Sequence, residues 1–232
     1  MRLHCVIFID WCSRSNVYRW VQLHTDALSL SLAEPFDQLK GVESACRSMV
    51  LDSMFADVGE ALARIPQLPL WSATSENQNP PTVAFALHPS EPITSTGDYL
   101  LSLPEQLEVL SRSVGASSGA GSGGPESDSA AVLLARQFLD EVCIKATDEY
   151  VARVDTLLAS LSDQGRRQLL EDVNYIHNII SYLTDSIPEP LAELKQLLTI
   201  PVEEYVGYCG TLKCLPPAFA HKLGVRRAVP SM

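Results

Sequence analysis

The sequence predicts an all-α protein, folded as an antiparallel bundle of helices. Apolar residues recur at steps of three or four through several long segments, which is the period of a helix with one buried face. Prolines stand at the ends of these segments, where they stop a helix because they lack the backbone N–H. The connections between the later segments are short, and short connections make consecutive helices antiparallel neighbours.

The first predicted helix covers residues 38–65 and is interpreted as one long amphipathic helix. Pro66 and Pro69 are expected to end it. Its apolar positions are Leu39, Val42, Cys46, Met49, Met54, Val58, Leu62 and Ile65. Residues 1–37 show no clean period, so they are expected to form an irregular N-terminal lead-in.

The rest of the first half, up to residue 110, is predicted to contain a loop and a shorter helix. Residues 72–82 are polar and rich in turn formers, which is typical of a loop. Asp98 is the expected N-cap of the following helix, which is kinked or restarted at Pro104. Residues 111–129 are mostly Gly and Ser, so they are predicted to be a disordered linker.

Residues 130–215 are predicted to form a C-terminal helical bundle. A helix from Ser129 to Leu161 is followed by Ser162, a plausible cap for the next helix. Pro188 and Pro190 break that second helix, a shorter one covers residues 189–199, and Pro201 opens another. Residues 216–232 are expected to be a flexible tail.

Composition excludes several functional classes. The net charge of −11 over 232 residues argues against nucleic-acid binding, because neutralising phosphates requires a basic face. No apolar run approaches the roughly 18 residues that a membrane helix needs. The six cysteines have irregular spacing and no Cys-x-x-Cys pair, which favours reduced thiols in the cytosol.

His177, in the segment LEDVNYIHNIISYL, is the first candidate for chemistry. No other histidine lies three or four residues away, so it cannot form a helical metal pair, and a boundary histidine beside the apolar stripe is the favoured interpretation. The spacing of Cys209 and Cys214 only weakly resembles half of a metal site, and the Gly-rich run 115–124 lacks the Lys of a phosphate-binding loop. The sequence therefore predicts no catalytic, cofactor-binding or metal-binding residue.

The charged clusters also have ordinary interpretations. Three pairs of adjacent acids on predicted helices are interpreted as solvated faces: Asp140/Glu141, Glu171/Asp172 and Glu203/Glu204. The segment HKLGVRR, residues 221–227, is the one basic concentration in the sequence. A solvated tail is favoured for it over contact with a phospholipid surface.

Several phrases resemble a known family when they are taken in order. They are VESACRSMVLDSMFADVGEALARIPQLPLW, GDYLLSLPEQLEVL, LLEDVNYIHNIISYL and LLTIPVEEYVGYC. Together they resemble the C-terminal part of the family of the seventh subunit of the conserved oligomeric Golgi complex. The resemblance covers roughly residues 38–225; members of that family are several times longer, and residues 1–24 do not match it.

The resemblance implies a helical module of the vesicle-tether rod type, peripheral on the cytosolic face of the Golgi membrane. It implies a role in intra-Golgi retrograde transport, and thereby in Golgi organisation and protein glycosylation. The implied partners are the other subunits of the complex, SNARE proteins and Rab GTPases, with no enzyme activity and no cofactor. Two alternatives remain: a free-standing helical adaptor outside the complex, and a small thiol enzyme suggested only by the cysteine and histidine counts.

Overall fold

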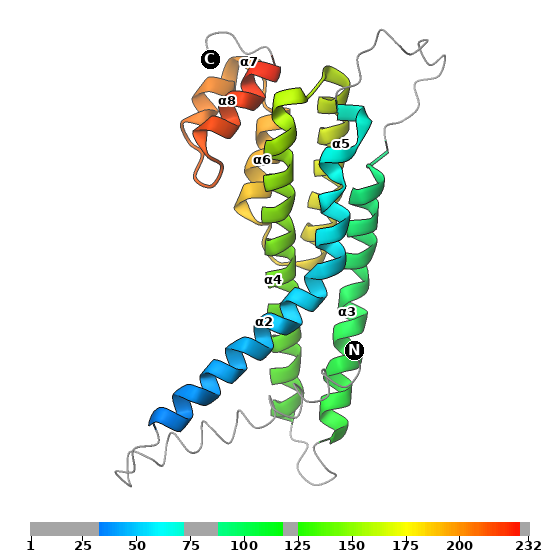
Figure 1. Ribbon diagram of the computed structural model, residues 1–232, viewed down its shortest axis with the longest axis vertical. Helices are drawn as coiled ribbons and strands as arrows, with labels where there is room; N and C mark the ends of the chain where they lie inside the picture. Colours follow the sequence, from blue (N-terminus) through cyan, green and yellow to red (C-terminus); the bar gives the residue numbers. More distant parts are fainter. Residues whose placement is uncertain (1–32, 72–87, 118–124, 228–232) are drawn as a thin grey trace. The chain divides into compact units, whose positions relative to one another are not determined.

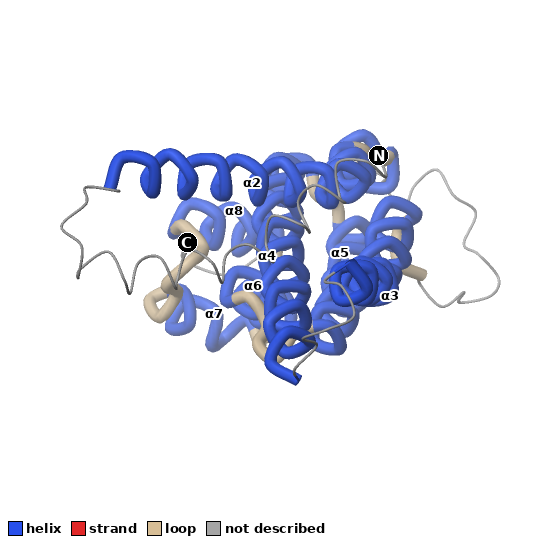
Figure 2. Tube along the Cα trace, turned by 90° about the horizontal axis from the view of Figure 1, so that it is seen from below, coloured by secondary structure: helices blue, strands red, loops and turns tan. Residues whose placement is uncertain are grey.

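The computed structural model describes residues 33–71, 88–117 and 125–227, and these residues form helices and short connections without a β-strand (Figures 1 and 2). The all-α prediction is confirmed. The α-helices are α2 (Ala33–Ala63), α3 (Glu91–Ser117), α4 (Pro125–Leu157), α5 (Asp163–Leu183), α6 (Glu189–Thr199), α7 (Val202–Cys209) and α8 (Pro217–Arg226). Three short 3₁₀ turns, η1 (Ile65–Gln67), η2 (Pro69–Trp71) and η4 (Leu158–Ser160), accompany them.

The chain divides into two compact units, and each of the three long helices contributes to both. Unit 1 contains the described residues 33–54, 102–117 and 125–139. Unit 2 contains residues 55–71, 88–101 and 140–227. Unit 2 therefore holds the second half of α4 together with the whole of α5, α6, α7 and α8.

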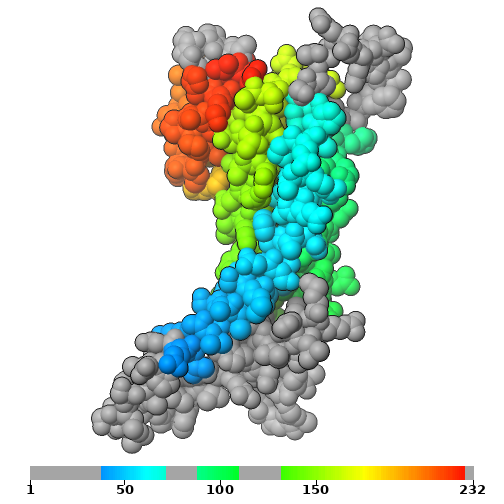
Figure 3. Space-filling view, in the orientation of Figure 1, coloured from blue at the N-terminus to red at the C-terminus, as the bar shows by residue number. Residues whose placement is uncertain are grey.

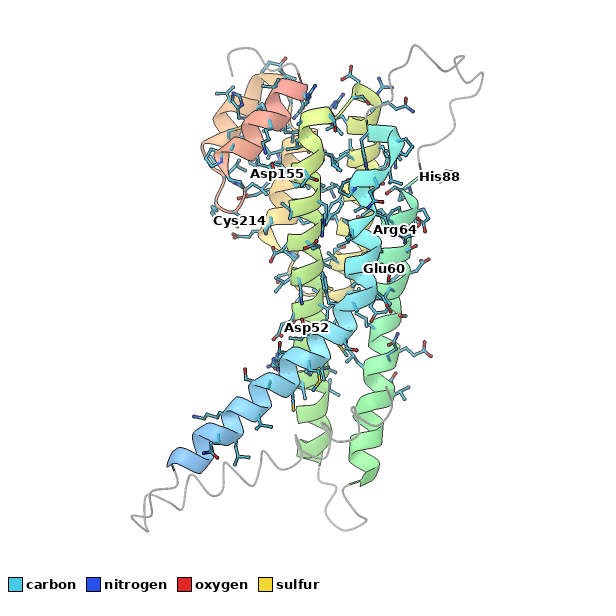
Figure 4. All side chains as sticks on the ribbon, viewed as in Figure 1. Asp52, Glu60, Arg64, His88, Asp155 and Cys214 are labelled. Carbon is cyan, nitrogen blue, oxygen red and sulfur yellow. The ribbon has the colours of Figure 1, made fainter. Side chains whose placement is uncertain are left out.

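The end of α2 follows the prediction. The helix stops at Ala63, and the two prolines then stand in consecutive 3₁₀ turns. Trp71 is buried at the end of this segment and donates its indole N–H to the carbonyl of Ile65 at 2.6 Å. Arg64 forms an exposed ion pair with Glu91 at 3.2 Å, next to the start of α3 (Arg64 is labelled in Figure 4). The beginning of α2 differs from the prediction: it lies at Ala33, and residues 1–32 are outside the described part of the chain.

The single apolar face predicted for residues 38–65 is wrong. Val58, Leu62 and Ile65 are buried in unit 2, whereas Val42 and Met49 are exposed. The step from Met49 to the next apolar position of the stripe is five residues, which turns the pattern to another side of the helix.

The start of α3 also corrects the prediction. The helix begins at Glu91, so Asp98 lies in its interior and is not an N-cap. The carbonyl of Ser90 accepts the first helical bonds, from the N–H groups of Ile93 and Thr94. Pro92 fits there because the first turn of a helix does not use its own N–H groups. The helix then continues past Pro104 without a restart.

The predicted linker 111–129 is mostly replaced by helix. Helix α3 continues to Ser117, and α4 begins at Pro125, a favourable first helical residue. Adding a residue to an existing helix costs little compared with starting one, so small polar residues can extend α3. Residues 118–124 lie outside the described residues, as does the whole of the predicted loop 72–82.

The core of unit 2 lies among the second half of α4, α5 and α6. The apolar stripe predicted for α5 consists of Val173, Ile176, Ile180 and Leu183. The first three are fully buried, which confirms the prediction for them, whereas Leu183 is half-buried. Helix α5 begins as expected after Ser162, whose hydroxyl accepts the N–H of Gly165 at 3.0 Å. Burying each such apolar side chain stabilises the fold by about 1.5–3 kcal/mol, so this stripe explains why α5 is held in place.

The predicted tail is largely helical. Residues 217–226 form α8, with Phe219 and Leu223 buried on one face. The hydroxyl of the buried Tyr205 on α7 donates to the carbonyl of Ala220 at 2.8 Å, which ties α7 to α8. The prediction of a flexible tail is therefore wrong for residues 217–226. Phe219 and Leu223 are four residues apart, so they lie on one face of a helix and can be buried together.

Gly165 lies where α5 meets the end of η2. A Cβ placed there would lie 2.8 Å from the carbonyl oxygen of Trp71 and 3.1 Å from its Cα. The same carbonyl accepts the N–H of Ser162 at 2.8 Å, so the backbone cannot move away without losing that bond. The small size of this residue therefore lets two segments of unit 2 approach closely.

We expect Gly165→Ala to lower the free energy of unfolding by about 1–3 kcal/mol, because the added methyl group clashes with backbone atoms. Gly207→Ala is the matched control, since a Cβ at this helical position meets nothing within 4 Å. The control is expected to stabilise by about 0.5–1 kcal/mol, as alanine favours a helix more than glycine does. Urea unfolding of both variants checks this pair; equal effects would contradict it.

Candidate functional site

Asp172, on α5, is a fully buried carboxylate that holds the segment before α3. One of its oxygens accepts the backbone N–H of Ser90 at 2.7 Å, and the other accepts the hydroxyl of Ser90 at 2.7 Å. The side-chain amide of Gln168 donates to the same carboxylate at 2.9 Å and to the carbonyl of His88 at 2.7 Å. Two residues of α5 thus bind the residues that lead into α3, within unit 2.

Burial raises the pKa of Asp172, while the hydrogen bonds from Ser90 and Gln168 act in the opposite direction. The sequence interpretation of Glu171/Asp172 as a solvated pair is therefore wrong for Asp172. A signal was present in the sequence: Asp172 lies three residues after Leu169 and four before Ile176, on the apolar stripe. A carboxylate on such a stripe needs buried donors, and only the fold supplies them.

Two further polar groups of unit 2 are buried in the interior. The buried hydroxyls of Thr147 and Tyr150, on α4, have no hydrogen-bond partner among the described residues. Burial raises the pKa of Tyr150, and the charge of Asp172 raises it further. Tyr150 therefore stays protonated at neutral pH and cannot serve as a base.

Glu193, on α6, is the second buried carboxylate, and no pattern in the sequence distinguished it from a solvated acid. Its oxygens accept the backbone N–H groups of three successive residues in the loop between α7 and α8. These donors are Lys213 at 2.7 Å, Cys214 at 3.1 Å and Leu215 at 2.8 Å. The carboxylate thereby fixes the loop that leads into α8.

The basic cluster 221–227 is largely bound to the rest of unit 2. Lys222 pairs with Asp155 on α4 at 2.8 Å (Asp155 is labelled in Figure 4). Arg226 donates to the carbonyls of Leu158 and Ala159, in η4. Arg227 donates to the carbonyls of Leu197 and Ile200 at the end of α6, and its guanidinium lies 5.1 Å from the ring centroid of Tyr205.

These contacts give the cluster a structural role. Helices end with carbonyl groups that have no partner within the helix, and arginine side chains satisfy them favourably. The carbonyls of Leu197 and Ile200 are such groups at the end of α6. The expectation of a solvated tail is therefore wrong for Arg227, which is half-buried.

His177 lies at the boundary of the core, half-buried on α5. Its Nδ1 is 3.3 Å from the Nζ of Lys195 on α6. Burial lowers the pKa of His177 and the charge of Lys195 lowers it further, while a hydrogen bond with Asn178 raises it. The neutral imidazole can accept a hydrogen bond from the ammonium group of Lys195, which agrees with the interpretation of His177 as a boundary residue.

The lowered pKa predicts the sign of a pH effect. The unfolded chain binds a proton at His177 near pH 6.5, whereas the folded chain binds it only at lower pH. Acid therefore favours the unfolded state, and this contribution to stability is lost as the pH falls from about 6.5 through the folded pKa. We expect His177→Gln to lose less stability than the wild type over this range, and Lys195→Gln to show an intermediate loss. Urea unfolding at a series of pH values checks this, and parallel curves for all three proteins would contradict it.

The two cysteines of the weak half-site do not form a metal site with other residues of the described chain. Cys209 is half-buried on α7, and Cys214 is exposed in the following loop, where Figure 4 labels it. The thiol of Cys214 donates to the carboxylate of Glu189 at 3.3 Å, and this contact raises the pKa of Cys214. The described ranges contain no group of three or more His, Cys, Asp or Glu side chains that could hold a metal ion.

Taken together, the polar groups of unit 2 bind backbone at the ends of helices. Asp172 binds the lead-in to α3, Glu193 binds the loop before α8, and Arg227 binds the end of α6. No helix in the described residues has both the length and the apolar character needed to cross a bilayer.

Comparison with known proteins agrees with the resemblance found in the sequence, but the expectation that residues 1–24 do not match the family is wrong for residues 18–24. The sequence model of a family described as Golgi complex component 7 matches residues 18–222. A protein of Arabidopsis thaliana named "Conserved oligomeric Golgi complex subunit 7" is 31% identical over 153 residues. The alignment covers 66% of this chain and 18% of that relative, so the chain spans less than a fifth of the relative's length. No solved structure matches the chain.

Proposed function

Because the chain belongs to the Golgi complex component 7 family, we propose that it is a non-catalytic subunit, or part of one, of the oligomeric Golgi tethering complex. In this role it acts in intra-Golgi retrograde vesicle transport, and thereby in Golgi organisation and protein glycosylation. The observation that carries the proposal is the family match, which extends over residues 18–222 of the 232 in the chain. The resemblance of phrases in the same order along the sequence supports it.

The arrangement of polar groups fits a role as a binding module. The two buried carboxylates, Asp172 and Glu193, use their oxygens to hold backbone N–H groups in unit 2. A carboxylate committed to such bonds positions helices for their neighbours. In this proposal the exposed helix faces contact partners, while the interior keeps those faces in place.

The proposed partners are the other subunits of the complex, together with SNARE proteins and Rab GTPases. The proposed location is the cytosolic face of the Golgi membrane, where the chain is peripheral. Lys222, Arg226 and Arg227 already contact protein groups. The proposal therefore assigns the attachment to protein partners and not to the basic cluster 221–227.

Affinity capture of the tagged full chain from cells, followed by quantitative mass spectrometry, tests this proposal. We expect the other subunits of the Golgi tethering complex to be enriched together, and the tagged chain to overlap with a Golgi marker in microscopy. Asp172→Ala, which removes an internal support of the fold, is expected to reduce both signals. A wild-type chain that is folded by circular dichroism but captures none of these subunits would contradict the proposal and favour a helical adaptor outside the complex.

A further inference from the structure

The first half of α2 carries four apolar residues that form a stripe, here called the α2 stripe: Leu39, Val42, Cys46 and Met49. Their steps of three, four and three match the a and d positions of a heptad, the pattern by which one helix packs along another. Val42 is 50% exposed and Met49 is 56% exposed. Residues 40–45 are all exposed, and their blue surface is visible in Figure 3, whereas Leu39 and Cys46 are half-buried.

The α2 stripe faces away from the contact between α2 and α4 in unit 1. The guanidinium of Arg47 lies 4.9 Å from the ring centroid of Phe138 on α4, which marks the side of α2 that meets α4. Successive residues of a helix are rotated by about 100°, which places the centre of the stripe roughly 120° around the axis from Arg47. The exposed apolar residues therefore do not belong to the packing of unit 1.

The buried residues of α2 lie on the other side of the helix. Val58 follows Arg47 by eleven residues, so the same rotation places it within about 20° of Arg47 on the helix surface. Val58 and Leu62 are completely buried in unit 2. Helix α2 thus has one apolar face that packs within the chain and a second that is exposed.

Exposed apolar residues are concentrated in unit 1. The ten large hydrophobic residues exposed among the described positions are split evenly between the units, although unit 2 contributes many more described residues. The five in unit 1 are Val42, Met49, Val109, Val132 and Leu133. Apolar surface gathered in this way marks an interaction site more often than scattered residues do.

The charges beside the α2 stripe indicate what kind of partner fits. With Leu39 at position a, Glu43 falls at position e and Asp52 at position g, and no Lys or Arg occupies an e or g position between residues 38 and 52. Asp52 is labelled on α2 in Figure 4. Residues at e and g choose the partner of a paired helix, and acids there select lysine and arginine. A second copy of the chain, with a net charge of −11, would bring acids to the same seam.

We propose that the α2 stripe is the docking site for an amphipathic helix of another protein, with apolar residues at its a and d positions and Lys or Arg at its flanking e and g positions. The inference rests on the proposed function, because it names the chemistry of a partner helix for the binding module. The apolar residues of the stripe provide the contact area. Glu43 and Asp52 provide the negative charge that selects a basic partner; Asp52 also accepts the hydroxyl of Ser48 at 3.5 Å.

The test uses the full chain and three synthetic helical peptides, each labelled for fluorescence anisotropy. The first has three heptads with Leu at a and d and Lys at e and g; the second has Glu in place of Lys; the third is a scrambled form of the first with the same composition. We expect the Lys peptide to bind more tightly than the other two. Equal binding of the Lys peptide and its scrambled form would reduce the effect to overall charge and overturn the proposal.

Variants of α2 locate the binding site. Val42→Gln with Met49→Gln is expected to weaken binding of the Lys peptide by about tenfold or more, because both apolar contacts are lost. Ile144→Gln with Val206→Gln, at residues of unit 2 with similar exposure, is the matched control and is expected to bind as the wild type does. Unchanged binding by the stripe variant, with helicity preserved, would overturn the proposal.

Charge reversal tests whether the acids beside the α2 stripe select a basic partner helix. Glu43→Lys with Asp52→Lys is expected to transfer the preference to the Glu peptide, and an unchanged preference for the Lys peptide would contradict the assigned partner chemistry. Sedimentation of the wild type and the stripe variant tests whether a second copy of the chain occupies the α2 stripe instead. If the wild type is a dimer and the stripe substitutions make it monomeric, the α2 stripe binds a second copy of the chain, and the proposal is overturned.

The proposed function and this inference can fail separately. If the wild type and the stripe variant capture the same Golgi tether subunits in equal amounts, the proposed function stands and the docking site is wrong. If the stripe variant no longer binds the Lys peptide while the wild type captures no tether subunit, the docking site is supported and the proposed membership in the tethering complex is contradicted.

Discussion

Replacing Asp172 by alanine is expected to lower the free energy of unfolding by about 2–4 kcal/mol. The substitution removes the acceptor of three hydrogen bonds, two from Ser90 and one from Gln168. The bond from the backbone N–H of Ser90 is the costliest loss, because Ser90 is buried. Part of the loss is offset, since burial of the carboxylate itself raises its pKa and so disfavours the charged form.

Urea unfolding at pH 7 measures this effect, with Asp148→Ala as the matched control. Asp148 is an exposed acid in the interior of α4. Its replacement is expected to change stability by no more than about 0.5 kcal/mol. Asp172→Asn is expected to fall between the two, because its amide keeps one oxygen acceptor. Equal stabilities for Asp172→Ala and Asp148→Ala would contradict a role for Asp172 in holding the start of α3.

Replacing Glu193 by alanine is expected to destabilise the end of the chain by about 2–4 kcal/mol. The carboxylate accepts the backbone N–H groups of Lys213, Cys214 and Leu215, and the alanine variant leaves these three donors without their acceptor. The loop before α8 then loses its attachment to α6. We therefore expect the amides of this loop and of α8 to exchange hydrogen faster, while the amides of α5 keep their protection.

Glu189→Ala is the matched control for this second prediction. Glu189 is on the same helix and contacts the same loop, but through exposed side-chain groups: the Nζ of Lys213 at 3.8 Å and the thiol of Cys214 at 3.3 Å. Exposed pairs of this kind contribute at most about 1 kcal/mol. Hydrogen exchange followed by mass spectrometry distinguishes the two variants. Uniformly faster exchange throughout unit 2 would mean that the segment does not open by itself.

The two buried carboxylates show that the partners of an acidic residue cannot be predicted from the sequence around it. Asp172 lies on the apolar stripe of α5, which indicates burial, and Glu193 lies in the ordinary helical phrase EPLAELKQLLT. In neither case does the neighbouring sequence show which donors the carboxylate meets. Their partners are 82 and about 20 residues away in the chain. A donor that is distant in sequence leaves no local signal, so the role of each acid appears only after the helices have packed.

Local chemistry, in contrast, was sufficient for several helix ends. Pro66 and Pro69 follow the end of α2, Ser162 caps α5, and Pro201 precedes α7, as the sequence predicted. Each of these signals acts within one turn, through a missing N–H or a side chain that accepts a neighbouring N–H. The same locality explains the error at Asp98, because a good capping residue has no effect once the helix has started seven residues earlier, at Glu91.

The sequence by itself determined the all-α class, the end of α2, the apolar stripe of α5 and the family, since all of these depend on periodicity, on neighbouring residues or on ordered phrases. Only the tertiary structure decided which acids are buried, that Arg227 binds the end of α6, and which face of α2 remains exposed. The physical reason is that burial is a property of pairs of elements. An apolar residue at helical spacing, such as Met49 or Val58, has the same pattern in either case until a neighbouring helix covers one and not the other.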